Sequence, residues 1–243
     1  MGHGDNASLG TLGDSVRIPM ASSRTPKAAA KAKAQPASTL VLLVRHGQTP
    51  TTGTTLPGRA KGLHLSELGV SQAQAAAQRI TKLTNVDAVY ASPLERTRET
   101  AAPIAKALGL KVLTERGLLE CDFGEWTGGS LAKLRKTPEW ATVQSHPSGF
   151  RFPGGESFAE MQIRTTSTLD RLAHNHRGRT IVCVSHADPI KAALAHSLGT
   201  HLDLFQRIVV SPCSISAVLL SSGTPIVLSV NSTGDDLSRL VVS

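Results

Sequence analysis

Apolar residues are arranged along the chain in two alternating patterns. One pattern is a short run dominated by apolar residues, and it occurs at residues 40–44, 86–91, 111–113 and 180–184. Runs of this length are typical of strands that are buried on both faces, whereas a helix usually needs ~10–12 residues. The four runs are therefore predicted to be strands of a sheet that is covered on both sides.

The second pattern is an apolar residue every three or four positions, which is typical of amphipathic helices. It occurs at residues 66–83, 95–108, 156–174 and 188–198. Ser66 is expected to cap the first helix, Gly109 to end the second, and Asp188 to cap the last with Pro189 at its first position. In the first helix the expected buried face consists of Leu68, Ala75, Ala76, Ile80 and Leu83.

Strands that alternate with helices predict an α/β fold with a mostly parallel central sheet and helices on both faces. Residues 215–220 and 226–230 add a closing hairpin, because a short Ser- and Gly-containing turn joins them. Residues 128–155 hold several Gly and Pro and are expected to form an irregular cap, with a short helix, over the strand ends. Ligands of such folds bind outside the carboxyl ends of the strands, which is where chemistry is expected.

The first 38 residues differ in composition from the rest of the chain. They are rich in Gly, Ser, Ala and Pro and poor in large apolar residues, so they cannot bury enough surface to offset the entropy of ordering. We interpret residues 1–38 as a disordered basic leader and residues 39–243 as one folded domain. An organelle transit peptide and a vector-derived extension before Met20 are the alternatives, whereas the apolar core of a secretory signal is missing.

Charge narrows the class of partner. The chain carries 26 Lys and Arg against 18 Asp and Glu, a formal net charge of +8. Such an excess suits an anionic partner: a nucleic acid, a membrane surface or a small phosphorylated molecule.

The three cysteines are odd in number and far apart, which excludes a disulfide scaffold: Cys121, Cys183 and Cys213. No apolar run reaches the ~18–20 residues that a membrane-spanning helix needs.

Polar residues that suit a phosphate group follow the predicted strands. They are Arg45, His46 and Gly47 after residues 40–44, Ser92 and Arg96 after 86–91, Glu120 after 111–113, and Ser185 and His186 after 180–184. Arginine binds phosphate oxygens in bidentate geometry, and a neutral imidazole is a good nucleophile towards phosphorus. One edge of the sheet is therefore predicted to hold a phosphate site.

These residues also carry a resemblance. The segments Arg45-His46-Gly47 and Ser92-Pro93-Leu94-x-Arg96, the acidic Glu120 and the pair Ser185-His186 are similar in order and spacing to the histidine phosphatase superfamily, also called the phosphoglycerate mutase-like family. The resemblance covers roughly residues 40–230. It implies a phosphatase of that fold, with no metal and no other cofactor.

By the same resemblance, His46 is the nucleophile that becomes phosphohistidine, and Glu120 is the general acid and base. Arg45, Arg96 and His186 bind the phosphoryl oxygens and stabilise the developing charge. Thr52 and Gly47 are further substrate contacts. Thr52 stands where the family often has Asn, which leaves one hydroxyl for this contact.

Three functions remain open from the sequence. Residues 120–128 run quickly into the cap, as in phosphatase branches, so hydrolysis of a phosphomonoester is favoured over phosphoglycerate mutase activity. A non-catalytic binder of a phosphorylated ligand or of nucleic acid is less consistent with a complete catalytic set. We expect a cytoplasmic protein that acts on a small phosphorylated substrate without nucleic-acid or membrane partners, and a homodimer is compatible with the sequence.

Aromatic residues are concentrated in the predicted cap: Trp126, Trp140, Phe150 and Phe152. We interpret them as packing within the cap. The alternative is that they line an outer pocket for the organic leaving group of the substrate.

Overall fold

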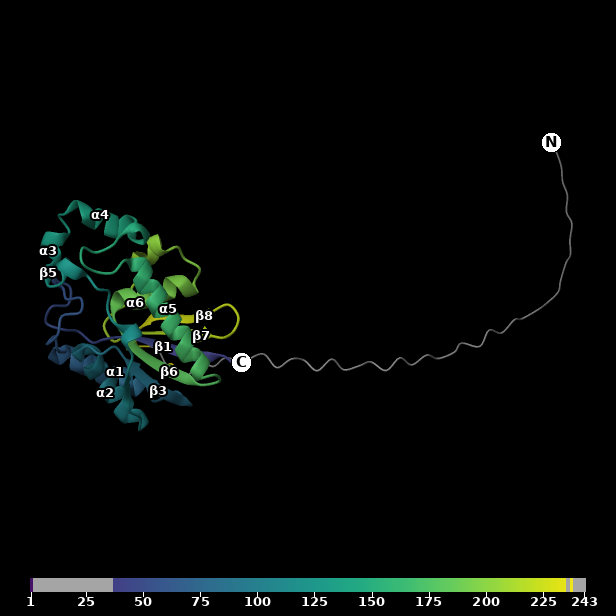
Figure 1. Ribbon diagram of the computed structural model, residues 1–243. Coiled ribbons are helices and arrows are strands. Elements are labelled where there is room, and N and C mark those ends of the chain that lie inside the picture. Colours follow the sequence, from purple (N-terminus) through teal and green to yellow (C-terminus); the bar gives the residue numbers. More distant parts are fainter. Residues whose placement is uncertain (2–36, 235–236, 238–243) are drawn as a thin grey trace, which may run out of the picture. The chain divides into compact units, whose positions relative to one another are not determined.

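The computed structural model of the chain describes Met1, residues 37–234 and Leu237 (Figure 1). The predicted leader at residues 1–38 therefore lies outside the described residues, apart from Met1, Ala37 and Ser38.

A six-stranded sheet organises the described part of the chain. Its strands are β1 (Thr39–Arg45), β3 (Val86–Ala91), β4 (Val112–Thr114), β6 (Thr180–Ser185), β7 (Ile215–Leu220) and β8 (Ile226–Ser232). Their order is β4-β3-β6-β1-β7-β8. The first four are mutually parallel, and β7 and β8 form the antiparallel hairpin at one edge. The predicted mostly parallel sheet with a closing hairpin is confirmed.

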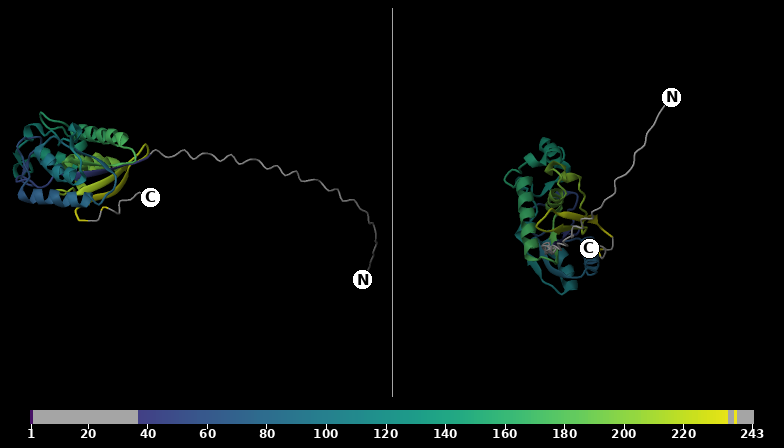
Figure 2. Two further views of the ribbon diagram at one scale, coloured as in Figure 1. Left: turned by 90° about the horizontal axis from the view of Figure 1, so that it is seen from below. Right: turned by 90° about the vertical axis from the view of Figure 1, so that its right-hand side faces the viewer.

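Two pairs of helices cover the two faces of this sheet (Figures 1 and 2). The helices are α1 (Glu67–Ile80), α2 (Glu95–Leu108), α5 (Phe158–Asn175) and α6 (Ala187–Ser197). Helices α1 and α2 pack against one face, and α5 and α6 against the other. The sheet is buried on both sides, which is why β1 and β6 are apolar at every position between their first and last residues.

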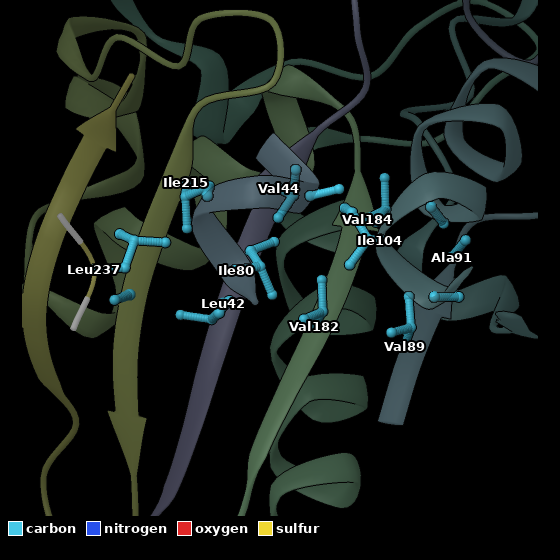
Figure 3. Close-up of a cluster of buried hydrophobic side chains, with 14 of the residues drawn as sticks. Leu42, Val44, Ile80, Val89, Ala91, Ile104, Val182, Val184, Ile215 and Leu237 are labelled. Carbon is cyan, nitrogen blue, oxygen red and sulfur yellow. The ribbon is translucent and has the colours of Figure 1, made fainter. Parts of the chain in front are cut away.

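Strand β1 shows how one strand contributes to both halves of the core. Leu42 and Val44 face α1 and α2, where Ile80 and Ile104 meet them (Figure 3). Val41 and Leu43 point to the other face, towards α5 and α6. Successive strand residues point to opposite faces, and burial of each such side chain contributes about 1.5–3 kcal/mol.

Helix α1 begins at its predicted cap, but its predicted buried face is wrong in part. The Ser66 hydroxyl accepts a hydrogen bond from the backbone N–H of Gly69 at 3.1 Å. Leu68 is 53% exposed, and Ala75 is exposed as well. The buried face instead consists of Gly69, Ala73, Ala76, Ala77 and Ile80.

A close backbone approach explains this rotation of α1. A Cβ atom on Gly69 would lie 2.1 Å from the carbonyl oxygen of Gln48, and one on Gly47 would lie 2.6 Å from the carbonyl oxygen of Gly69. Only a residue without a side chain fits where the helix crosses the end of β1. The small residues of the helix therefore face the sheet, and Leu68 lies outside.

The start of α6 also differs from the prediction. His186, and not Asp188, is the residue that precedes the first helical turn. Asp188 lies inside that turn, and its carboxylate is 3.5 Å from the Lys191 ammonium. An acidic residue in the first turn is favourable with the helix dipole even when it does not cap the helix.

The cap lies beyond the carboxyl ends of the parallel strands (Figure 1). It contains the two-stranded pair β2 (Thr55–Leu56) and β5 (Gly129–Ser130), the helices α3 (Leu131–Leu134) and α4 (Pro138–Ser145), and the 3-10 turns Gly124–Trp126 and Pro147–Gly149. Two further 3-10 turns, Arg116–Leu118 and Leu202–Arg207, lie outside it. Within the described residues, no helix combines the length and hydrophobicity needed to cross a membrane.

Candidate active site

Each predicted catalytic residue follows a parallel strand or lies just beyond one. Arg45 is the last residue of β1, and His46 comes next. His186 follows β6, and Arg96 lies in the first turn of α2 after β3. Glu120 follows the 3-10 turn after β4. Because these strands are parallel, their carboxyl ends meet at one edge of the sheet, and the side chains converge there.

His46 is buried, and its ring is fixed by one hydrogen bond. Its Nδ1 atom lies 2.8 Å from the carbonyl oxygen of Gly47, which can only accept, so Nδ1 carries the proton. The lone pair is therefore on Nε2. Burial, followed by the positive charges of Arg96 and Arg45, lowers the pKa of His46 to about 3. The imidazole is neutral at physiological pH, which is the form that can act as a nucleophile.

A second buried imidazole lies against the first. The ring centroids of His46 and His186 are 5.2 Å apart, with the planes inclined at 64°. The Nε2 atom of His186 is hydrogen-bonded to the Ser92 hydroxyl at 2.9 Å, and its buried Nδ1 atom has no partner among the described residues. Burial and the charge of Arg96 lower the pKa of His186 well below its usual value.

Arg96 is buried and Arg45 is half-buried, and neither guanidinium group has a carboxylate partner among the described residues. Arg96 is fully buried, and it makes one side-chain hydrogen bond, from Nη2 to the carbonyl oxygen of Gly58 at 2.8 Å. Arg45 donates from Nη1 to the carbonyl oxygen of Val210 at 2.7 Å. In the described part of the chain, Nε of Arg45 and both Nε and Nη1 of Arg96 are buried and unpartnered. Burial lowers the pKa of both guanidinium groups, yet they stay charged.

Buried cationic donors without an anion are costly, because an unpaired charge loses its hydration. Unpartnered donors from Arg45, Arg96 and His186 therefore indicate a site shaped for an anion. A tetrahedral phosphoryl group has the charge and the number of acceptor oxygens that these donors require.

Glu120 is the carboxyl group of this site. It is 7% exposed, and its Oε1 atom accepts a hydrogen bond from the Cys121 N–H at 2.9 Å. Burial, followed by the negative charge of Asp188, raises its pKa to about 7, against the opposing effect of Arg96 and Arg45. A carboxyl group with this pKa can give and take a proton near neutral pH.

Thr52 and Gly47 have different environments. Thr52 lines the same cavity as His46, where its hydroxyl accepts the Thr49 N–H at 2.9 Å. The N–H of Gly47 already donates to the Thr100 hydroxyl at 3.0 Å. Gly47 is thus needed for its carbonyl, which orients His46, and for its close contact with Gly69. Its predicted role as a substrate contact is not supported by this hydrogen bonding.

The cavity over these groups has a volume of about 380 Å³ and opens between the sheet edge and the cap. Arg45, His46, Thr52 and Glu120 line it, together with residues of α6 and of the cap. A larger cavity of about 440 Å³, near His174, Arg177 and His196, adjoins the β7–β8 turn at the other end of the sheet. None of the predicted catalytic residues lines that second cavity.

Two further arginines hold the backbone of Glu120 in place. Arg59 donates from Nε to the carbonyl oxygen of Glu120 at 2.9 Å, and Arg164 donates to the same oxygen at 3.4 Å. Both guanidinium groups also bind the carboxylate of Glu156, at 2.8 Å and 2.6 Å. Arg59 makes a further ion pair with Asp122 at 3.2 Å. This cluster ties the Glu120 loop to the cap and to α5.

A model for branch 1 of the histidine phosphatase superfamily matches residues 41–233, which run from β1 to β8. The chain belongs to this superfamily. The family predicted from the strand ends, and the α/β fold that it implies, are confirmed.

Individual members of the superfamily are similar over most of the chain. Phosphoserine phosphatase 1 of Hydrogenobacter thermophilus is 33% identical over 198 residues, covering 79% of this chain and 92% of that protein. A bifunctional protein of Mycobacterium tuberculosis is 31% identical over 232 residues, covering 95% of this chain but 64% of that longer protein. A solved structure of phosphoserine phosphatase from Entamoeba histolytica, in complex with 3-phosphoglyceric acid, has a TM-score of 0.72 at 29% identity and covers 80% of this chain and 98% of that chain.

Sequence reasoning missed several residues of this histidine phosphatase site. Ser92 is not among the predicted catalytic or substrate-binding residues, yet its hydroxyl fixes the second histidine. Arg59 and Arg164 gave no signal, because they lie far from the strand ends in sequence. Glu156 carries no motif of its own in the sequence analysis, and its two arginine partners become visible only in three dimensions.

Proposed function

We propose that the chain is a metal-independent phosphomonoester hydrolase that works through a phosphohistidine intermediate on His46. The observation that carries this proposal is the set of buried, unpartnered donors of Arg45, Arg96 and His186 beside a neutral imidazole. Membership of the histidine phosphatase superfamily supports it.

In the first step, Nε2 of His46 attacks the phosphorus atom and the bond from phosphorus to the ester oxygen breaks. The leaving oxygen takes a proton from the Glu120 carboxyl group, whose raised pKa keeps a substantial protonated fraction near pH 7. The products of this step are the free alcohol and phosphohistidine.

In the second step, the Glu120 carboxylate takes a proton from a water molecule, and the hydroxide attacks phosphorus. The bond from phosphorus to Nε2 breaks, which restores neutral His46 and releases inorganic phosphate. One carboxyl group thus serves as acid and then as base, because its pKa is close to the working pH.

Arg45, Arg96 and His186 stabilise the charge on the three equatorial oxygens in both steps. Their donors are fixed before the substrate arrives, so no reorganisation is needed as charge develops. In this mechanism the Ser92 hydroxyl donates to Nε2 of His186, so that the proton of the ring is on Nδ1, the atom without a partner within the described residues. These three cationic or polar groups supply the stabilisation that a metal ion gives in other phosphatases.

Replacement of His46 by alanine tests the proposal. We expect His46→Ala to abolish hydrolysis of 4-nitrophenyl phosphate, and His64→Ala, at an exposed histidine outside the site, to retain it. Rapid quenching of the wild-type enzyme with labelled substrate should trap a phosphoenzyme that is labile in acid and stable in alkali. Two results would refute the proposal. One is hydrolysis by His46→Ala, and the other is loss of hydrolysis by the wild type when it is treated with a chelator.

The substrate is expected to be a small phosphomonoester. Relatives named phosphoserine phosphatases support this class for the present chain. The mutase alternative is tested by measuring phosphoglycerate isomerisation with and without bisphosphoglycerate. Isomerisation faster than hydrolysis would favour the mutase.

A further inference from the structure

We propose that the leaving group of the preferred substrate has an apolar part that binds in a chamber inside the cap. This inference rests on the proposed phosphatase function and concerns its substrate class: phosphate esters of hydrophobic alcohols rather than of an amino acid. The cap chamber is a cavity of about 270 Å³ whose wall includes Leu131, Trp140, Val143, Gln144, Phe152 and Phe158, with the exposed Arg135 also on it.

The cap chamber adjoins the cavity that contains His46 and Glu120. The two cavities share six lining residues: Leu56, Phe123, Leu131, Asp188, Lys191 and Gln206. An ester whose phosphoryl group lies at His46 can therefore extend its alcohol portion past Lys191 and Gln206 into the chamber.

The inner wall of the chamber is apolar and well packed. Phe152 and Phe158 are each 1% exposed, and Val143 is 3% exposed. The rings of Phe152 and Phe158 lie 5.2 Å apart in an edge-to-face arrangement, and Phe152 packs in the same way against Trp126. Leu131 and Trp140, which are only partly buried, lie on the same wall and offer a leaving group dispersion contacts in front of these packed rings.

Charged groups at the junction of the two cavities already have partners. The Lys191 ammonium lies 3.5 Å from the Asp188 carboxylate and donates to the Gln206 amide oxygen at 3.0 Å. A leaving group with its own carboxylate and ammonium would have to displace these contacts. An apolar leaving group passes these contacts without displacing them. Gln206 then remains available to bind one polar atom of the leaving group.

The rim of the His46 cavity is apolar too. Val209 is 63% exposed there, beside Ile208. An exposed large aliphatic side chain at the mouth of a polar site is consistent with contact to an apolar part of the ligand.

A series of primary alkyl phosphates tests this inference, because their leaving groups have similar intrinsic reactivity. We would measure kcat/KM for ethyl, butyl and hexyl phosphate and for O-phosphoserine. Each methylene that leaves water is expected to raise kcat/KM by up to about fourfold. We expect hexyl phosphate to exceed both ethyl phosphate and phosphoserine by at least about tenfold.

Two variants locate the effect. Trp140→Ala should remove most of the gain from ethyl to hexyl phosphate while kcat/KM for ethyl phosphate stays within about twofold. Gln144→Trp, which fills the chamber from an exposed position, should do the same without removing a packed side chain. Glu139→Trp, on the same helix but outside the lining, is the matched control and should keep the full gain.

The outcomes separate this inference from the proposed function. Three results would overturn the inference while leaving the proposed phosphatase function intact. They are equal kcat/KM for the three alkyl phosphates, a higher kcat/KM for phosphoserine than for hexyl phosphate, and an unchanged gain from ethyl to hexyl phosphate in both chamber variants. Absence of hydrolysis for every ester, including 4-nitrophenyl phosphate, would instead overturn the proposed function.

Discussion

Two pairs of arginines act on Glu120, and their surroundings are opposite. Arg59 and Arg164 hydrogen-bond the main-chain carbonyl of Glu120 and are ion-paired with Glu156. Arg45 and Arg96 lie near its carboxyl group, and neither forms an ion pair with any described residue. The charges of the first pair are balanced by Glu156, although Nε of Arg164 is buried without a partner among the described residues. The second pair has three such donors, Nε of Arg45 and Nε and Nη1 of Arg96, and no carboxylate in the described part of the chain forms an ion pair with them.

Under the proposed function, the difference means that arginine serves the structure in one pair and the chemistry in the other. A paired arginine stabilises the fold that surrounds it, because its charge is balanced locally. An unpaired buried arginine costs stability in the folded protein and recovers it when an anion binds. We therefore expect substitutions in the two pairs to separate activity from stability.

The largest effect is expected at the group between the two pairs. Glu120→Gln removes the acid but keeps the carbonyl that Arg59 and Arg164 bind, and its amide oxygen can still accept the Cys121 N–H. We expect kcat for hexyl phosphate to fall about 10²- to 10⁴-fold with little change in the unfolding midpoint. Loss of the folded state in this variant would contradict the expected separation of activity from stability.

The pH profile adds the direction of the titration. The acid form of Glu120 protonates the leaving group, and its pKa is raised to about 7. In the wild type kcat/KM for an alkyl phosphate should therefore fall as pH rises above about 7. The decline should be absent from the residual activity of Glu120→Gln, and it should be weaker for 4-nitrophenyl phosphate, whose leaving group needs less protonation.

Arg96→Met tests the role of the two arginines that have no ion pair with a described residue, Arg45 and Arg96. We expect kcat/KM to fall about 10²- to 10³-fold, because donors to the phosphoryl oxygens are lost. The free energy of unfolding should not decrease, because a buried unpaired charge is replaced by an apolar side chain of similar length. Inorganic phosphate should raise the unfolding midpoint of the wild type more than that of this variant.

Arg164→Met is the counterpart in the paired set. It leaves Glu156 with one cationic partner and removes donors to the carbonyl oxygens of Gly117 and Leu119. We expect the free energy of unfolding to fall by about 1–3 kcal/mol, with a smaller loss of kcat/KM than in Arg96→Met. Chemical denaturation of both variants would show whether Arg164→Met is less stable than Arg96→Met, as we expect.

The smallest effect is expected at an exposed pair. Arg151 is ion-paired with Glu160, but both side chains are more than half exposed to solvent. Arg151→Met should leave the unfolding midpoint and kcat/KM unchanged within error, because solvent and salt screen such a pair. A measurable loss of either quantity would mean that pairing alone, without burial, decides the role of an arginine here.

Much of the fold follows from local patterns. The apolar run at 40–44 and the alternation of strands with helices predict a buried, mostly parallel sheet, and the strand ends indicate where the site lies. The prediction that Leu68 lies on the buried face of α1 is wrong, because the rotation of the helix depends on the contact of Gly69 with Gln48, twenty-one residues earlier. The predicted start of α6 is wrong because the helix begins at Ala187, which places Asp188 inside the first turn, where it pairs with Lys191.

The sequence by itself determined the alternation of the main strands and helices and the family, and it predicts His46, Arg45, Arg96, Glu120 and His186 as the site residues. Period and motif are local properties that survive in a linear string. Only the tertiary structure decided which arginines are paired, which proton His46 keeps, and that the cap chamber adjoins the catalytic cavity. Pairing, burial and pKa depend on neighbours that folding brings together from distant parts of the chain.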